Sequence, residues 1–330
     1  MPRLETEITE ITTGLGALGY DVLTALREPP PQFVNVQASN WDNLRRAYED
    51  GGHETLFTTA WSNGRALLLA VNGLRGRLPI RVEWKGPEKQ VEQDPVPADL
   101  RIDNVFLVSV KTRSSVLWNR SPAQVFLRQS QATHWYSETA PAQYQALYDA
   151  ARSLDAELSA LPRDVTQLAR PDGARLAAHL GSREWPAPLG ELYRDMAHQS
   201  ARRSAELWNE TLPTTAQRER AAWWLLRLGP APYFLLGDSA AAPLRIRIET
   251  PWDWRQRFEF LGLEIEPALD SGQPQVNWTL RVRDRLTGET LDTAGYVEIR
   301  WSHGRFRGHP EAKVQLRTRH ESVPGYSPLI

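Results

Sequence analysis

The sequence predicts a mixed α/β protein with a helical middle region and a β-rich last third. The first part of the chain follows the order helix, strands, helix, which is typical of an α/β fold. Residues 142–228 carry three amphipathic helical patterns, and the last third shows short apolar or alternating segments separated by Gly, Pro and Asp. We therefore expect three regions: an α/β core over 1–140, a helical subdomain over 141–228 and a β-rich domain over 229–330.

Composition narrows the class of protein. The chain of 330 residues has a formal net charge of −1, so any nucleic-acid surface must be a local one. The chain has no cysteine, which excludes a disulfide framework and a cysteine-ligated zinc site and fits a reducing compartment. No apolar run approaches the roughly 18 residues of a membrane helix, and the start is polar and acidic. We expect a cytoplasmic protein that does not contact a membrane.

The N-terminal segment predicts an amphipathic helix that ends near Gly19. Its apolar residues recur at helical spacing from Leu4 to Leu18, with Glu7 and Glu10 between them. We expect these acids on a solvated face, although Glu10 is also a candidate to support a site in the core. The short apolar run from Ala66 to Val71 predicts a buried strand.

The central stretch of the first region carries the candidate chemistry. Residues 105–110 are almost all apolar and predict a strand buried on both faces. This strand opens on Asp103 and closes on Lys111, and Glu83 lies in the preceding strand pattern. Charges at the ends of buried strands are costly unless they are paired or hold a metal. Because side chains alternate, we expect Asp103, Ser109 and Lys111 on one face.

Two carboxylates and an amine at such a site suit phosphodiester hydrolysis. Asp103 and Glu83 would hold Mg²⁺, with Mn²⁺ as a substitute, because hard cations prefer oxygen ligands. Lys111 would orient or help deprotonate the attacking water and offset charge on the phosphate. The catalytic candidates are therefore Asp103, Lys111 and Glu83, and the supporting candidates are Glu10, Ser109 and Lys85.

These residues, over roughly residues 4–130, resemble the PD-(D/E)xK nuclease superfamily. The resemblance implies a restriction-endonuclease-like mixed sheet flanked by helices, with Asp103 as the family's metal-binding aspartate and Lys111 as its lysine. Ser109 stands where the family has Glu or Gln, so either Glu83 supplies that ligand or the site is inactive. The resemblance implies a Mg²⁺-dependent endonuclease acting on DNA in restriction or anti-phage defence. The alternative is a catalytically inactive DNA-binding or assembly subunit of a defence or repair complex.

Other interpretations stay open at this point. A competing register takes Glu83-Trp84-Lys85 as the acid and lysine, with Glu54 or Asp50 upstream. Asp103 and Lys111 could also form a structural ion pair. The helical middle region could be a homodimer surface or a docking face for a partner protein.

A basic segment near the C-terminus, residues 300–319, is the second candidate surface. Arginines suit phosphate, aromatic rings suit stacking, and glycines allow close backbone approach. An exposed edge strand guarded by basic residues would give the same pattern. A base-excising enzyme or an RNA-targeting toxin that uses His303 and His309 is a third class. The nucleic-acid-binding candidates are Arg300, His303, Arg305, Arg307 and Lys313.

Overall fold

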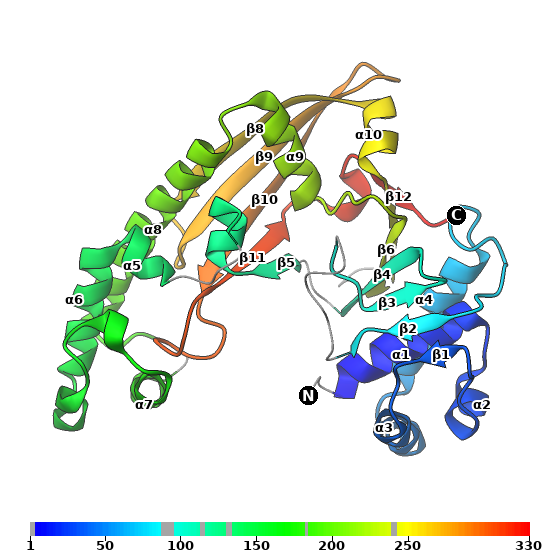
Figure 1. Cartoon of the computed structure of the whole chain (residues 1–330), viewed down its shortest axis with the longest axis horizontal. Helices are drawn as coiled ribbons and strands as arrows, with labels where there is room; N and C mark the ends of the chain where they lie inside the picture. Colours follow the sequence, from blue (N-terminus) through cyan, green and yellow to red (C-terminus); the bar gives the residue numbers. More distant parts are fainter. Residues whose placement is uncertain (1–3, 87–95, 113–115, 130–133, 182–183, 239–242) are drawn as a thin grey trace.

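The computed structural model describes residues 4–86, 96–112, 116–129, 134–181, 184–238 and 243–330. Within these residues the strands form a seven-stranded sheet and a five-stranded sheet, which lie in two lobes of an arch (Figure 1). Both sheets are accompanied by helices, so the mixed α/β class predicted from the sequence is confirmed. No helix in the described part of the chain is long and apolar enough to cross a membrane.

The seven-stranded sheet is mixed, and its order is β1-β2-β3-β4-β6-β7-β12. β2, β3 and β4 are antiparallel neighbours, while β4 and β6 run parallel. The end of β2, the start of β3 and the ends of β4 and β6 therefore lie at the same edge of the sheet. The strands are β1 (Phe33–Val34), β2 (Val82–Trp84), β3 (Leu100–Ile102), β4 (Phe106–Thr112), β6 (Tyr233–Asp238), β7 (Pro243–Ile248) and β12 (Tyr326–Pro328).

Two helices, α1 (Leu4–Leu18) and α4 (Glu54–Leu69), pack against one face of this sheet. They approach backbone to backbone, because a Cβ atom on Gly64 would lie 2.0 Å from the carbonyl oxygen of Thr13 and one on Gly16 would lie 2.2 Å from that of Trp61. Glycine is therefore required at both positions. Two further helices, α2 (Val22–Arg27) and α3 (Ala38–Glu49), complete this lobe.

The five-stranded sheet is antiparallel, in the order β5-β11-β10-β9-β8. Alternate residues of its long strands are buried, and the helix α8 (Leu189–Thr211) packs across β8 and β9. The strands are β5 (Val116–Arg120), β8 (Phe258–Ala268), β9 (Gln275–Asp284), β10 (Thr290–Arg300) and β11 (Glu311–Leu316). The other helices of this lobe are the π-helix η2 (Ala123–Leu127), α5 (Trp135–Thr139), α6 (Pro141–Arg152), α7 (Arg170–Leu180), α9 (Thr215–Leu225), α10 (Pro251–Arg257) and the short 3-10 helices η3 (Ala156–Ala160) and η4 (Val165–Gln167). A further 3-10 helix, η5 (His320–Ser322), contacts β12 of the first sheet.

The prediction of a strand from Ala66 to Val71 is wrong. Residues 66–69 form the last turn of α4, whose buried face also includes Phe57 and Ala60. A short apolar run does not distinguish a buried strand from a buried helix turn, and here the residues upstream continue the helical period. The strands expected at 80–84 and 105–110 are present as β2 and β4.

The two sheets do not follow the expected region boundaries. β5 lies within 1–140 but pairs with β11 of the second sheet, at Lys313↔Asn119. β6, β7 and β12 lie within 229–330 but complete the first sheet. The helices expected over 141–228 are present and pack mainly on the second lobe.

An ion pair joins Arg257, the last residue of α10, to Asp284, the last residue of β9. The Arg257 guanidinium donates two hydrogen bonds to Oδ2 of Asp284, at 3.0 and 2.9 Å, and Leu286 N–H donates to Oδ1 at 2.9 Å. The hydrogen bonds from Arg257, followed by the one from Leu286, lower the pKa of Asp284. A lowered pKa in the folded state stabilises the fold above the unfolded value of about 3.9.

We therefore expect an Asp284→Asn variant to unfold at lower urea concentration than the wild type at pH 7. The contribution of the carboxylate disappears as the pH falls through the folded pKa, so the gap between the two proteins narrows at pH 3. Urea midpoints at both pH values measure this. A gap that stays constant with pH would show that the charge on Asp284 is irrelevant.

Candidate functional site

Asp103 does not open β4 as expected. It lies in the hairpin turn between β3 and β4, where Asp103 and Asn104 both have positive φ, at 49° and 60°. Its Oδ1 accepts hydrogen bonds from the backbone N–H groups of Ile80 and Arg81, at 2.9 and 3.1 Å. Aspartate and asparagine tolerate this backbone conformation and cap turns. Asp103 is thus a turn residue that ties a neighbouring loop to the hairpin.

Asp103 and Lys111 lie at opposite ends of β4. The five residue steps from Phe106 to Lys111 already span about 17 Å of extended strand. The structure therefore does not bring these two predicted catalytic residues together. Asp103 therefore does not share a face of β4 with Ser109 and Lys111, because the turn at Asp103 and Asn104 precedes the strand.

Glu83 is engaged by its neighbours. The Nε of Arg101, directly opposite on β3, donates to Oε2 at 2.6 Å, and Asn35 Nδ2 donates to Oε1 at 3.2 Å. Both carboxylate oxygens are occupied, and Glu83 is only 8% exposed. In this arrangement Glu83 neutralises Arg101 between two strands, and it is not placed as a metal ligand beside Lys111.

A different acid, Asp99, contacts the β4 backbone one residue before Lys111. It directly precedes β3, and its side-chain Oδ2 accepts a hydrogen bond from the backbone N–H of Val110 at 2.6 Å. Val110 stands between Ser109 and Lys111, so the Asp99 carboxylate lies against the Ser109-Val110-Lys111 segment. The N–H of Lys85 donates to the Asp99 carbonyl at 2.9 Å. Asp99, Ser109 and Lys85 are each no more than 9% exposed.

The sequence analysis did not select Asp99, because the apolar run that starts at Val105 led to a strand that opens on Asp103. Two signals could have found it. Asp99 directly precedes the alternating segment Leu100 to Ile102, and Asp103-Asn104 is a dipeptide that favours a turn. Placing the turn at Asp103 would have made Asp99 the acid at the start of a strand.

The acids of α1 face the protein interior. Glu7 and Glu10 are each 5% exposed, so the solvated face expected for them is wrong. Glu10 Oε2 accepts a hydrogen bond from Trp84 Nε1 at 2.6 Å, which ties α1 to the end of β2. Glu7 Oε2 is buried and has no hydrogen-bond partner among the described residues. A buried carboxylate oxygen without a donor is costly, unless it is protonated or meets a cation.

Lys111 lines a cavity of about 500 Å³ at the sheet edge. Three acids from different elements line the same cavity: Glu5 of α1, Glu54 of α4 and Asp238 at the end of β6. Glu54 is one of the upstream acids of the competing register. In the described part of the chain no three His, Asp or Glu side chains are close enough to form a ready-made metal site. Mg²⁺ is commonly held by one or two carboxylates together with water and substrate phosphate.

A buried arginine completes the surroundings of Ser109. Arg227, 2% exposed, donates from Nη1 to the Tyr233 hydroxyl at 2.7 Å and approaches Ser109 Oγ at 3.5 Å. The Tyr233 hydroxyl donates to the Pro97 carbonyl at 2.7 Å, and burial raises its pKa, so the proton for this bond is retained. Arg227 and Tyr233 thus fix the segment that carries Asp99.

Comparison with known proteins does not assign this chain to a family. Neither protein-family models, curated proteins nor solved structures gave a match. The functional inference therefore rests on the site geometry and on the resemblance carried by the residues themselves.

The second candidate surface, on the β10–β11 hairpin, is largely engaged in internal contacts. Arg300 lies 3.6 Å from Glu298, and His303 and Lys313 lie 3.8 and 3.9 Å from the Glu311 carboxylate. Arg305 donates to the backbone carbonyls of Leu180 and Glu184, at 3.2 and 2.9 Å, and lies over the Trp185 ring.

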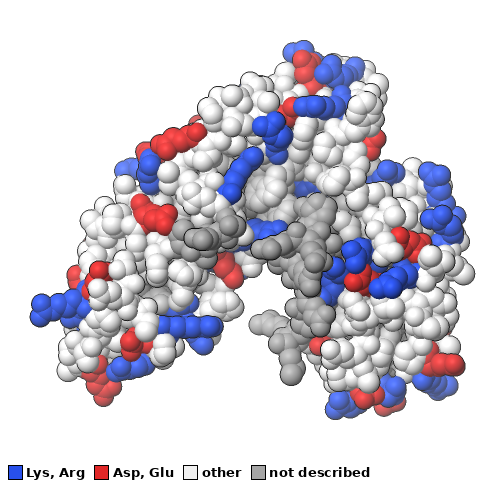
Figure 2. All heavy atoms as spheres, in the orientation of Figure 1, with Lys and Arg blue, Asp and Glu red and all other residues white. Residues whose placement is uncertain are grey.

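Arg307 is exposed, and its side chain makes no ion pair or hydrogen bond with a described residue. The hairpin therefore offers less uncommitted positive charge than the sequence indicates. Figure 2 shows a hollow between the two lobes, and Lys and Arg side chains gathered on the face of the right-hand lobe, over the region of β2 to β4.

Proposed function

We propose that this chain is a metal-dependent nuclease whose site lies at the edge of the seven-stranded sheet where β2, β4 and β6 end. The observation that carries the proposal is the packing of the buried Asp99 carboxylate against the segment that ends in Lys111. The Asp99 carboxylate contacts Val110, and the next residue, Lys111, carries an amine. A carboxylate and an amine are groups that phosphodiester hydrolysis uses.

Carboxylate oxygens are the ligands that a hard divalent cation prefers. Two acids are the candidates: Asp99, and Glu7 of α1, whose buried Oε2 has no donor among the described residues. We propose that Asp99, with a carboxylate of α1, holds Mg²⁺, or Mn²⁺ in its place. Such an ion would supply Lewis-acid stabilisation of the phosphate and lower the pKa of a water.

Lys111 has the position of a phosphate-binding group. Lys111 is among the residues that border the cavity at the strand end, where a phosphodiester could enter from solvent. The ammonium would orient the attacked phosphate and stabilise the charge that develops on its oxygens. Ser109, which replaces the acid of the resembled family, would then act through its hydroxyl and not as a charged ligand.

The substrate class follows from the resemblance. A mixed sheet with an acid-bearing helix on one face supports a restriction-endonuclease-like core, and we propose DNA as the substrate, in restriction or anti-phage defence within the cytoplasm. The DNA strand would lie in the hollow between the two lobes (Figure 2).

The test is cleavage of supercoiled plasmid and of single-stranded DNA with Mg²⁺, Mn²⁺ or EDTA. We expect metal-dependent cleavage by the wild type. The cleavage rate of Lys111→Ala should be lower by a factor of about 10² at least. Arg202→Ala, which removes one positive charge from the exposed side of α8, is the control and should retain activity. Equal cleavage by Lys111→Ala and wild type would place the chemistry elsewhere.

A second candidate, a DNA-binding or assembly subunit without catalysis, is favoured by one observation. The Arg227 guanidinium is buried beside Ser109 and supplies a fixed positive charge near Asp99 without a metal. A homodimer or a partner protein would then complete the assembly. Metal-independent DNA binding with no cleavage under any condition would favour this candidate over the nuclease.

A further inference from the structure

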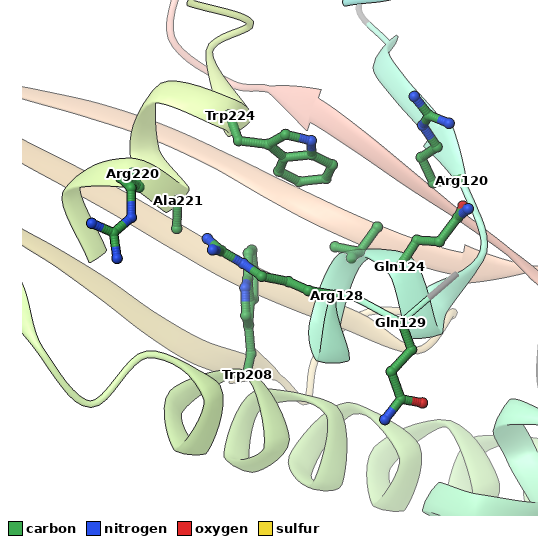
Figure 3. Close-up of a pocket in the computed structure, with 9 residues that line it drawn as sticks. Arg120, Gln124, Arg128, Gln129, Trp208, Arg220, Ala221 and Trp224 are labelled. Atoms are coloured by element: carbon green, nitrogen blue, oxygen red, sulfur yellow. The ribbon is translucent and has the colours of Figure 1, made fainter. Parts of the chain in front are cut away.

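A basic pocket of about 380 Å³ lies in the second lobe, apart from the cavity at Lys111. Three arginines from three elements line it: Arg120 at the end of β5, Arg128 after η2 and Arg220 of α9. Figure 3 shows the Arg128 side chain extending toward the helix that carries Arg220, with Trp208 below it and Trp224 above. Its volume lies within the usual range of roughly 300–1,000 Å³ for small-ligand pockets.

The backbone that presents Arg128 is unusual. Arg128 caps η2, a single turn of π-helix, and has a positive φ of 56°. π-helical turns and left-handed non-glycine residues cost free energy and occur disproportionately at functional sites. This strained turn directs the guanidinium across the pocket toward α9. The strained backbone therefore indicates a functional site independently of the residues that line the pocket.

The positive charges of the pocket are not balanced by protein. No carboxylate lines the pocket, and within the described residues none of the three guanidinium groups forms an ion pair or a hydrogen bond. Burial and the charge of Arg220 lower the pKa of Arg128, and burial and the charge of Arg227 lower that of Arg120. Three like charges held in one pocket repel one another, and a bound anion would remove this cost.

An aromatic surface lies beside these charges. One face of Trp224 stacks on Trp118, with ring centroids 4.7 Å apart and an interplanar angle of 16°. Trp224 is only half-buried and lines the pocket, so part of its ring borders the cavity. Gln124 adds an amide that Figure 3 shows pointing toward the Arg120 side chain. Guanidinium forks beside an aromatic ring and an amide match a phosphate attached to a base.

We propose that this pocket binds a phosphorylated nucleotide, with the phosphate held by Arg128 and Arg220 and the base placed against Trp224. The polymeric form of this ligand rests on the proposed function, in which a DNA strand occupies the hollow between the lobes. The pocket would then anchor one nucleotide of that strand at a distance from the cleavage site.

A chain of contacts joins the pocket to the proposed cleavage site. Trp118 packs under Trp224, Arg227 lies over Trp118 with 5.6 Å between guanidinium carbon and ring centroid, and Arg227 reaches Ser109. Trp118 Nε1 also donates to the Trp224 carbonyl at 2.8 Å. Occupancy of the pocket would fix Trp224 and, through these contacts, the surroundings of Arg227.

The test is titration calorimetry of the full chain in EDTA, so that no cleavage occurs. The probes are inorganic phosphate, thymidine, thymidine 5′-monophosphate, and a short single-stranded oligonucleotide with or without a 5′-phosphate. We expect the monophosphate to bind at least about tenfold more tightly than thymidine or inorganic phosphate. If the 5′-phosphorylated oligonucleotide binds more tightly than the unphosphorylated one, the pocket holds the phosphate at a strand end. If both bind equally tightly, the pocket holds an internal phosphate.

The double variant Arg128→Gln, Arg220→Gln should weaken binding of the monophosphate by about 100-fold, since a hydrogen bond to a charged group contributes about 1.5–3 kcal/mol. Arg202→Gln on the exposed side of α8 is the matched control and should bind as the wild type does. Unchanged circular dichroism and thermal midpoints would show that the double variant folds.

The proposal and the proposed nuclease function can fail separately. Lys111→Ala should retain full affinity for the monophosphate even if it no longer cleaves DNA. Binding by the double variant equal to wild type, or no binding of the monophosphate by the wild type, would overturn the pocket assignment. Neither result would change the outcome expected from the cleavage experiment.

Discussion

The Asp99→Asn variant is expected to lose metal-dependent cleavage by about 10²–10³-fold while remaining folded. The loss is of the size produced by removing one preorganised electrostatic group from a hydrolytic site. Asparagine has nearly the same volume, and its amide oxygen can accept the hydrogen bond that Val110 N–H gives to Asp99. The substitution therefore removes the charge at Asp99 and retains the backbone contact. Single-turnover cleavage rates in Mg²⁺ and in Mn²⁺ measure the effect.

Asp103→Asn is the matched control for this experiment. It makes the same change in charge four residues away, in a turn whose positive φ asparagine tolerates. An amide oxygen can keep the hydrogen bonds from Ile80 and Arg81, so stability should change by less than about 0.5 kcal/mol. Cleavage should match the wild type. If Asp103→Asn were the inactive variant and Asp99→Asn the active one, the site would have to be moved to the opposite end of β4.

The second large effect is expected from Gly64→Ala. The added methyl group would lie 2.0 Å from the Thr13 carbonyl oxygen and 2.7 Å from Ala17 N, both backbone atoms that cannot move aside alone. The α1 and α4 helices must separate, and such overpacking costs about 1–3 kcal/mol and occasionally more. The shift would also carry Glu7 and Glu10 away from the sheet edge.

Urea unfolding measures the loss of stability in Gly64→Ala, and Gly272→Ala is the control. Gly272 is exposed, has an ordinary φ and would place its Cβ in open space, so the same substitution should be nearly neutral there. A Gly64→Ala variant as stable as Gly272→Ala would mean that the two helices can separate without cost.

The spacing of apolar residues predicted the helices in which buried positions recur at a helical period. The apolar residues of α1 and the helices between 142 and 228 were recognised because one face of each packs on a core. The run from Ala66 to Val71 was misassigned because six apolar residues fit either a strand or the end of a helix.

The candidate site could be predicted only in part. Lys111 was placed correctly at the end of a buried strand, but its acidic neighbour depends on the position of the Asp103-Asn104 turn. The position of this turn decides which acid lies opposite the end of β4, and a single sequence carries little information on register. The burial of Glu7 and Glu10 depends on contacts with distant strands, which the pattern of α1 alone does not contain.

The exchange of strands between the two sheets has a consequence for synthesis on the ribosome. When β4 leaves the ribosome, its neighbour β6 is still separated from it by the entire helical region, and β5 must wait for β11. Neither lobe can be completed before the final strands emerge, so the nascent chain carries unpaired strand edges that favour aggregation. Closing such long loops slows folding, and a fragment ending after residue 140 would lack the partners of both β4 and β5. Chaperone dependence during expression, and failure of the isolated first 140 residues to fold, are the expected signs of this topology.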